Sequence, residues 1–125
     1  LLEMAHSRGV GAVVSKHDFQ GTPSAGEIFD TLAEMKRLGA DLPKYAVMPH
    51  TPWDVLALLE ATVRASEELG PVITMAMGGL GKISRVSGGT FGSCLTFAAG
   101  QRASAPGQLD PEDLSAILQD LDPRA

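Results

Sequence analysis

Apolar and polar residues alternate along the chain in two different rhythms. Four short apolar runs, bounded by Gly, Pro or Asp, predict β-strands at residues 11–15, 44–48, 72–77 and 94–99. Apolar residues at spacings of three and four predict amphipathic helices at residues 24–38, 51–69 and 111–121. Residues 81–88 leave room for one or two helical turns only, and the residues before the first strand have the character of a helix end.

Capping residues support two of the three long helices. Thr51 is a good N-cap, Pro52 suits the first helical position, and Asp54 complements the positive end of the helix dipole. Asp110 is the corresponding N-cap for the last helix, whose residues Leu114, Ile117, Leu118 and Leu121 are expected to point inward.

The alternation of strands and helices predicts an α/β fold with a parallel sheet. Four β-α units could form a small doubly wound sheet or half of an eight-unit barrel. Polar or reactive side chains share one parity, Ser15 with His17 in the first strand and Lys44 with Ala46 and Met48 in the second. Such residues favour a lined interior that is open to solvent at one end, as in a barrel. We therefore expect half of a TIM (β/α)8 barrel, with residues 1–125 forming one partial domain.

Composition narrows the class of protein further. The chain has 125 residues, 44% of them hydrophobic and 20% charged, which is typical of a globular domain. The net charge of −5 and the lack of a basic tract argue against nucleic acid as a partner, and no apolar run approaches the ~20 residues of a membrane span. Cys94 is the single cysteine, which fits a reducing, cytoplasmic location, and its apolar surroundings predict a buried thiol rather than a nucleophile.

Two residues could carry acid–base or covalent chemistry. His17 follows the first predicted strand, at the end of the sheet where barrel enzymes place catalytic groups. Lys44 opens the second predicted strand and would point into the barrel, where burial lowers an amine's pKa and supplies the neutral form that a Schiff base requires. Structural alternatives remain open: a histidine bonded to a neighbouring carbonyl, and a lysine that extends to the base of the sheet.

Further candidates lie in the loops after the later strands. Arg85, with glycines 78, 79 and 81 nearby, suits a carboxylate or a phosphate. Ser104 and Gln108 stand in a Pro- and Gly-containing loop that could close over a hydroxylated ligand. Met75, Met77 and Phe97 share matching strand positions, for which core packing is the alternative. His50 has a weaker context, and no metal-ligand cluster or phosphate loop of the Walker type is evident.

Six segments together resemble type I 3-dehydroquinate dehydratases in order and spacing. They are SKHDFxxTP (15–23), LPKYAVMP (42–49), ITMAMGGLGKISR (73–85), the Phe-Gly pair at 91–92, TFAAG (96–100) and ASAPGQ (103–108). Each segment alone is weakly specific, whereas six in the same order are highly specific. The resemblance implies the C-terminal half of a (β/α)8 barrel lyase that dehydrates 3-dehydroquinate to 3-dehydroshikimate, in the shikimate pathway, without a metal or organic cofactor.

The resemblance also implies roles for individual residues. Lys44 matches the family's Schiff-base lysine, and His17 matches the histidine that takes the C2 proton and later protonates the departing hydroxyl. Arg85 matches the arginine that holds the substrate carboxylate, and Ser104 and Gln108 match residues of the lid. Met75, Met77 and Phe97 match residues that pack around the substrate ring.

This sequence departs from the family pattern in length. Family chains are about twice as long, and their N-terminal half carries the residues that bind the ring hydroxyls and a glutamate that orients the histidine. We therefore expect this chain to pair with a second copy, as a homodimer, or with a separate N-terminal half, because a half-barrel exposes strand edges and apolar surface. The alternatives are a non-catalytic half-barrel that self-associates or binds a polyol carboxylate, and an enzyme resembling class I aldolases.

Overall fold

The computed structural model describes residues 1–122 and 124, so positions 123 and 125 of the predicted domain lie outside the described residues. Eight elements follow one another along the chain. They are α1 (Leu2–Ser7), β1 (Val13–Asp18), α2 (Ala25–Arg37), β2 (Leu42–Val47), α3 (Pro52–Leu69), β3 (Ile73–Ala76), α4 (Gly78–Ser87) and α5 (Pro111–Leu121). The strand–helix alternation predicted from the sequence is therefore present from β1 to α4.

The three strands form one parallel sheet in the order β1-β2-β3. Ser15 pairs with Lys44 and His17 with Ala46, and across the next pair of strands Lys44 lies beside Ile73 and Ala46 beside Met75. Residues that pair in register point to the same face of a sheet. The predicted shared parity of Lys44 with Ala46 is thus realised across all three strands.

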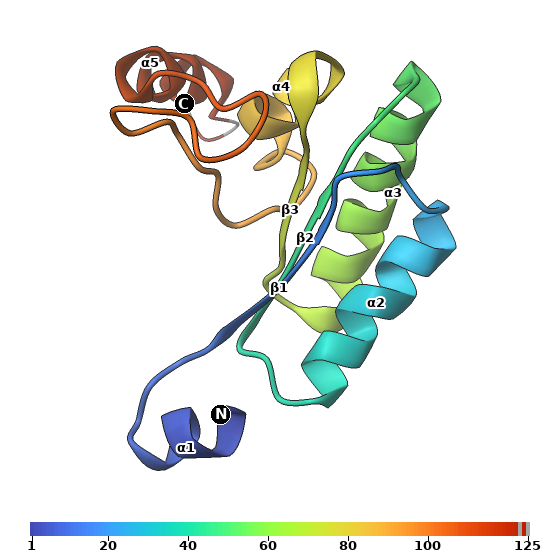
Figure 1. Ribbon diagram of the computed structural model, residues 1–125, viewed down its shortest axis with the longest axis vertical. Helices are drawn as coiled ribbons and strands as arrows, with labels where there is room; N and C mark the ends of the chain where they lie inside the picture. Colours follow the sequence, from blue (N-terminus) through green and yellow to red (C-terminus); the bar gives the residue numbers. More distant parts are fainter. Residues whose placement is uncertain (123, 125) are drawn as a thin grey trace.

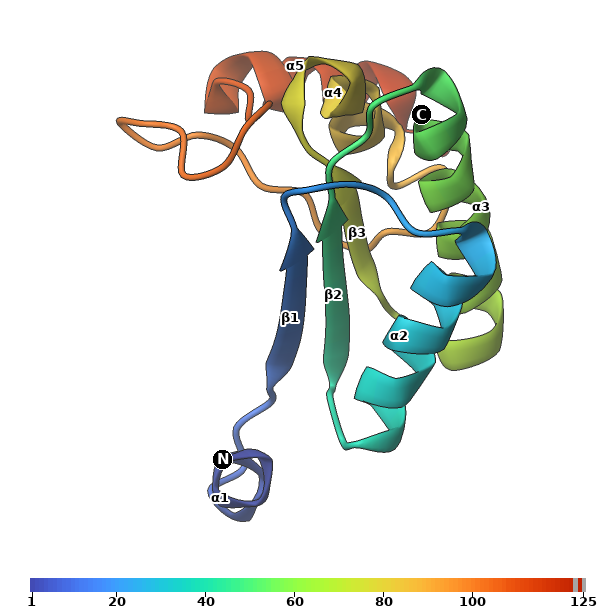
Figure 2. The same ribbon diagram turned by 45° about the vertical axis from the view of Figure 1, so that its right-hand side comes forward.

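Helices α2 and α3 cover the same face of this sheet (Figures 1 and 2). Their buried side chains, including Ile28, Leu32 and Leu58, pack with Tyr45 and Val47 of β2 into the larger apolar core. A smaller cluster on the opposite face contains Ala46, Ile73, Met75 and Met77. A doubly wound sheet would place helices on both faces, so winding on one side is the arrangement that the barrel prediction requires.

Caps begin the helices where the sequence predicts them. The Thr51 hydroxyl accepts from the Asp54 amide while the Asp54 carboxylate accepts from the Thr51 amide, which completes a capping box at the start of α3. Asp110 accepts from the amides of Glu112 and Asp113 at the start of α5. These contacts fix the points at which the chain leaves the carboxyl end of β2 and enters the last helix.

The fourth predicted strand, residues 94–99, does not form in the described chain. Ser93, just before this segment, forms an isolated parallel bridge with Val72, just before β3, and the Cys94 amide donates to the Val72 carbonyl at 2.9 Å. Two amides on the outer edge of β3 are already satisfied by side chains, Thr74 N–H by the Ser93 hydroxyl at 3.0 Å and Ala76 N–H by the Ser84 hydroxyl at 2.8 Å. Because those amide donors are already paired, they are not available for backbone hydrogen bonds with residues 95–97.

Three further expectations were wrong. The helix predicted as one or two turns begins earlier and runs for 10 residues as α4. Cys94 is exposed, because its segment is not enclosed as a strand. In α5 only Leu114 is buried, whereas Ile117 and Leu121 are 37% and 46% exposed, since no neighbouring strand covers them. Among the described residues, no helix is both long enough and apolar enough to cross a membrane.

Candidate active site

A cavity of about 250 Å³ opens on the sheet face opposite α2 and α3. Side chains from β1, β2 and β3 form its floor. The segment between residues 97 and 108, which precedes α5, forms its roof. Eleven residues line it: His17, Phe19, Lys44, Ala46, Met75, Met77, Arg85, Phe97, Ser104, Ala105 and Gln108. All eight site residues predicted from the sequence are among them.

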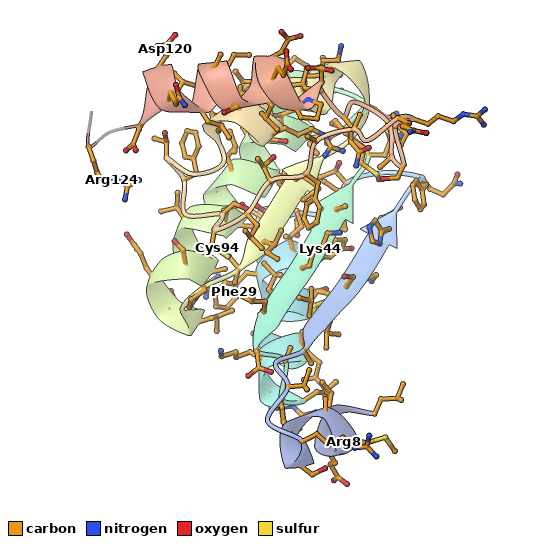
Figure 3. The ribbon with its side chains drawn as sticks, turned by 90° about the vertical axis from the view of Figure 1, so that its left-hand side faces the viewer. Arg8, Phe29, Lys44, Cys94, Asp120 and Arg124 are labelled. Carbon is orange, nitrogen blue, oxygen red and sulfur yellow. The ribbon has the colours of Figure 1, made fainter. Side chains whose placement is uncertain are left out.

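Lys44 stands in the middle of this floor, on the face of the sheet that is turned toward the viewer in Figure 3. The sequence predicted Lys44 as the first residue of this strand. β2 instead begins at Leu42, so Lys44 is its third residue. Its Nζ lies 4.3 Å from the centre of the Phe97 ring. Burial lowers the pKa of Lys44, and the positive charge of Arg85 lowers it further. Both causes favour the neutral, nucleophilic amine.

His17 occupies the next position up the neighbouring strand, paired with Ala46. Burial lowers the pKa of His17, with a further contribution from the charge of Lys44. A neutral imidazole can accept a proton, so the surroundings favour the base form of this residue at neutral pH. His17 and Lys44 therefore line the same cavity.

Arg85 supplies a second buried cation. Although its side chain is only 1% exposed, it has no carboxylate partner among the described residues. Its guanidinium donates to the Pro106 carbonyl at 3.0 Å and touches the Met75 sulfur at 3.5 Å, while its Nε–H has no acceptor. A buried guanidinium without an anion is costly, and the cavity it lines offers space for one.

The loop from Ala99 to Leu109 closes on itself and docks onto the start of α4. The Ala99 amide donates to the Leu109 carbonyl at 2.8 Å, and the Gly78 amide donates to the Pro106 carbonyl at 3.1 Å. At its tip, Ser104 and Gln108 bond each other through backbone and side chain. The Gly78 amide is therefore not free to bind a ligand, because it donates to the Pro106 carbonyl.

Sequence reasoning missed one cavity residue with an evident signal. Phe19 lines the cavity and stacks on His17, and it stands two residues after His17 in the motif SKHDF. Ala105 also lines the cavity and had not been singled out. His50 lies outside, where its ring bonds the Gln20 carbonyl at 2.6 Å. Within the described part of the chain, no group of three or more His, Cys, Asp or Glu side chains could hold a metal ion.

Comparison with known proteins decides the family. The family model described as type I 3-dehydroquinase matches residues 1–123. The chain belongs to the type I 3-dehydroquinase family. Among curated relatives, the 3-dehydroquinate dehydratase of Listeria monocytogenes is 52% identical over 119 residues, which are 94% of this chain and 47% of that relative. The enzyme of the same name from Bacillus licheniformis is 51% identical over 123 residues, or 97% of this chain and 48% of the relative.

Solved structures of this dehydroquinase family agree with the fold. The 3-dehydroquinate dehydratase of Geobacillus kaustophilus superposes with a TM-score of 0.93 at 48% identity, covering 95% of this chain and 47% of that one. The type I enzyme of Clostridium difficile, solved with covalently modified comenic acid, gives a TM-score of 0.90 at 48% identity, covering 96% and 48%. The chain thus spans about half the length of the dehydroquinases it matches.

Proposed function

We propose that this chain carries the Schiff-base half of a type I 3-dehydroquinate dehydratase, folded as half of a (β/α)8 barrel and acting on 3-dehydroquinate. One observation carries the proposal most strongly. Lys44, His17 and Arg85 come from β2, β1 and α4 to line one cavity that contains no carboxylate among its described lining residues. A cavity with cationic groups and a neutralised amine suits a substrate that bears a carboxylate and a ketone.

The proposed reaction uses each of these groups in turn. The neutral Lys44 amine attacks the substrate ketone, water leaves, and a cationic imine forms that withdraws electrons from the adjacent carbon. His17 takes a proton from that carbon, which gives an enamine. The enamine expels the hydroxyl group as His17 returns the proton to it, and water then hydrolyses the imine to release product and free Lys44.

The remaining cavity residues would bind rather than react. Arg85 is placed to pair with the substrate carboxylate, since its buried guanidinium keeps an unused Nε–H. Ser104 and Gln108 lie at the loop tip, where their mutual hydrogen bonds could be exchanged for bonds to the ligand. Met75, Met77 and Phe97 present apolar surface to the ring.

A missing half is part of the proposal. In the described sheet, β1 lies at one edge and its outer side has no neighbouring strand. Apolar side chains near both lateral edges of the sheet are exposed, among them Val13 of β1 at 52% and Leu95, beyond β3, at 50%. We infer that a second copy, or a separate half that the motif resemblance implies to be N-terminal, covers this surface, because such edges rarely stay open.

A cytoplasmic location is proposed on chemical grounds. Cys94 is the only cysteine, and its thiol is free and exposed. An exposed thiol persists in a reducing compartment and is oxidised outside one. Alkylation of Cys94 in freshly lysed cells would support this location, whereas a thiol that is blocked before lysis would contradict it.

The direct test is turnover. Purified chain, alone and mixed with a separately produced other half of the family barrel, would be given 3-dehydroquinate while formation of the conjugated product is followed by ultraviolet absorbance. We expect activity in the mixture that is lost in the Lys44→Ala variant. Absence of turnover in both samples, with binding retained, would favour the second candidate, a non-catalytic half-barrel that binds a polyol carboxylate. That candidate is suggested by the half-length match.

A further inference from the structure

The imidazole of His17 lacks a fixed polar partner in the described part of the chain. Its lowered pKa has two causes, burial and the charge of Lys44, and neither is a hydrogen bond that would hold the ring. A histidine that transfers protons must present one nitrogen in a defined direction, and this is commonly achieved by a carboxylate or carbonyl on the other nitrogen. The resemblance to the family assigns such a carboxylate to the other half of the barrel, so within this chain a contact that orients the ring is of another kind.

The contact is aromatic. The rings of His17 and Phe19 lie with their centres 5.9 Å apart and their planes only 11° from parallel. Both side chains line the same cavity. An offset stack of this kind limits rotation of the smaller ring about its side-chain bonds and favours one orientation by about fivefold.

The backbone next to β1 holds Phe19 in that position. Asp18, the last residue of β1, accepts from the amides of Gln20 at 2.9 Å and Gly21 at 3.1 Å. These bonds turn the chain directly after the strand and carry the ring of Phe19 back beside His17. The His50 ring also forms a hydrogen bond with the Gln20 carbonyl, which further stabilises the turn.

Core packing does not account for Phe19. Its side chain is 55% exposed and belongs to neither apolar cluster of the sheet. A side chain this exposed contributes little to stability. Stability therefore does not explain why Phe19 lies against one face of the His17 imidazole at the edge of the cavity. The feature of Phe19 that remains to be explained is its near-parallel orientation relative to the His17 ring.

We propose that Phe19 is a positioning residue that fixes the plane of the His17 ring, so that an imidazole nitrogen faces the carbon next to an imine formed on Lys44. This proposal rests on the proposed Schiff-base function for its chemical meaning. The stacking itself is a property of the free chain, so it is tested without any reaction.

The first test is nuclear magnetic resonance of the ring protons of the three histidines as a function of pH. In the parent chain the His17 signals are shifted by the Phe19 ring current. In Phe19→Leu the shift disappears, the His17 signals approach those of exposed His50, and the pKa of His17 rises because water reaches the ring. Phe19→Tyr keeps both properties. Phe97→Leu, which removes an aromatic ring from the same cavity but not from His17, leaves the His17 signals in place.

The second test separates positioning from binding. Recovered 3-dehydroquinate is analysed for deuterium at the carbon next to the imine after incubation in heavy water, and imine formation is measured in parallel by borohydride trapping. Phe19→Leu slows deuterium uptake about tenfold at saturating ligand, and trapping on Lys44 is unchanged. An equal loss of both would mean that Phe19 only binds the ligand and would overturn the proposal.

The two tests distinguish this proposal from the proposed function. If the parent chain traps no imine even when the other half is present, the function fails, while the ring-proton shifts still decide whether Phe19 orients His17. If the parent chain traps the imine but His17 has the same shifts and the same titration in the parent and in Phe19→Leu, the positioning role is rejected and the function stands.

Discussion

At the scale of single residues, the cavity is defined by an excess of positive charge. Lys44 and Arg85 are both withdrawn from water, and the described lining residues include no carboxylate to balance them. Such an arrangement lowers the pKa of the more easily neutralised group, which is the lysine. The same positive field attracts an anionic ligand. The excess of positive charge therefore favours both the neutral Lys44 amine and ligand binding.

Replacing Arg85 by Gln is expected to shift the pH dependence of imine formation on Lys44 to higher pH. Arg85 lowers the pKa of Lys44, so its removal raises that pKa and reduces the neutral fraction at any pH below it. The check is the yield of borohydride-trapped adduct across a pH series, with a small aldehyde as the carbonyl probe so that carboxylate binding plays no part. Lys82→Gln, on the exposed side of α4, is the matched control. An unshifted profile would contradict the assigned coupling.

Site residues were largely predictable at this scale. Alternation along β2 placed Lys44 on the face of Ala46, and the motif order placed His17 and Arg85 beside it. The link between Phe19 and His17 was missed, although residues two apart along an extended chain point to the same side. The roles of these residues in the reaction stay predictions.

At the scale of elements, local signals fixed the helix starts. The capping box of Thr51 and Asp54 begins α3, whose N-terminus follows the strand that carries Lys44. Thr51→Ala should lower the free energy of unfolding by about 1 kcal/mol, because the Asp54 amide at the start of the helix loses the hydroxyl that accepts its hydrogen bond. Urea denaturation measures this change, with Thr51→Ser as the control that keeps the hydroxyl. Equal stability of the parent and Thr51→Ala would show that α3 does not depend on this cap.

The docked loop offers a second prediction at this scale. Gly107 has φ of +83°, and a Cβ atom there would lie 2.5 Å from the Gly78 carbonyl oxygen. Gly107→Ala should therefore free the loop from α4 and expose the Gly78 amide, which now donates to Pro106. Hydrogen exchange at Gly78 should accelerate at least about tenfold. Gly100→Ala, where an added Cβ meets nothing within 4 Å, is the control. Unchanged exchange in Gly107→Ala would show that the loop tolerates the side chain.

The strand expected at residues 94–99 marks the limit of prediction from local sequence. Its composition is that of a strand, but a strand also needs a free edge to pair with. On β3 the available amides of Thr74 and Ala76 are taken by serine hydroxyls. Sequence periodicity reports which residues favour extended structure, and it contains no information about whether a neighbour's donors are already occupied.

At the scale of the whole molecule, the sheet is unfinished. Element order, one-sided winding and the position of the cavity followed from the sequence, whereas the exposure of Cys94, Ile117 and Leu121 did not. Those residues were predicted as buried from the apolar run around Cys94 and from the apolar spacing of the last helix, and neither pattern shows whether a neighbouring element covers them. A chain that spans about half the length of its relatives leaves surfaces that the remaining half would cover.

Association is therefore expected, through the open edge of β1. Light scattering at micromolar concentration should give a mass above that of one chain, or a mixed complex when the other half is present. Val13→Lys, which adds a charge to β1, should weaken association at least about tenfold, because edge lysines oppose strand pairing. Leu56→Lys is the control on the outer face of α3, with a similarly exposed parent residue at 54% against 52%. A well-folded monomer in all samples would contradict the expectation.

The central claim is that Lys44 is the residue that bonds covalently to the substrate, and one measurement tests it directly. The chain, with its other half if association requires it, is incubated with 3-dehydroquinate, reduced with borohydride and analysed by mass spectrometry of the intact protein and its peptides. We expect a single adduct on the peptide that contains Lys44, and none in Lys44→Ala. No adduct in the parent protein, or an adduct that persists in Lys44→Ala, would contradict it.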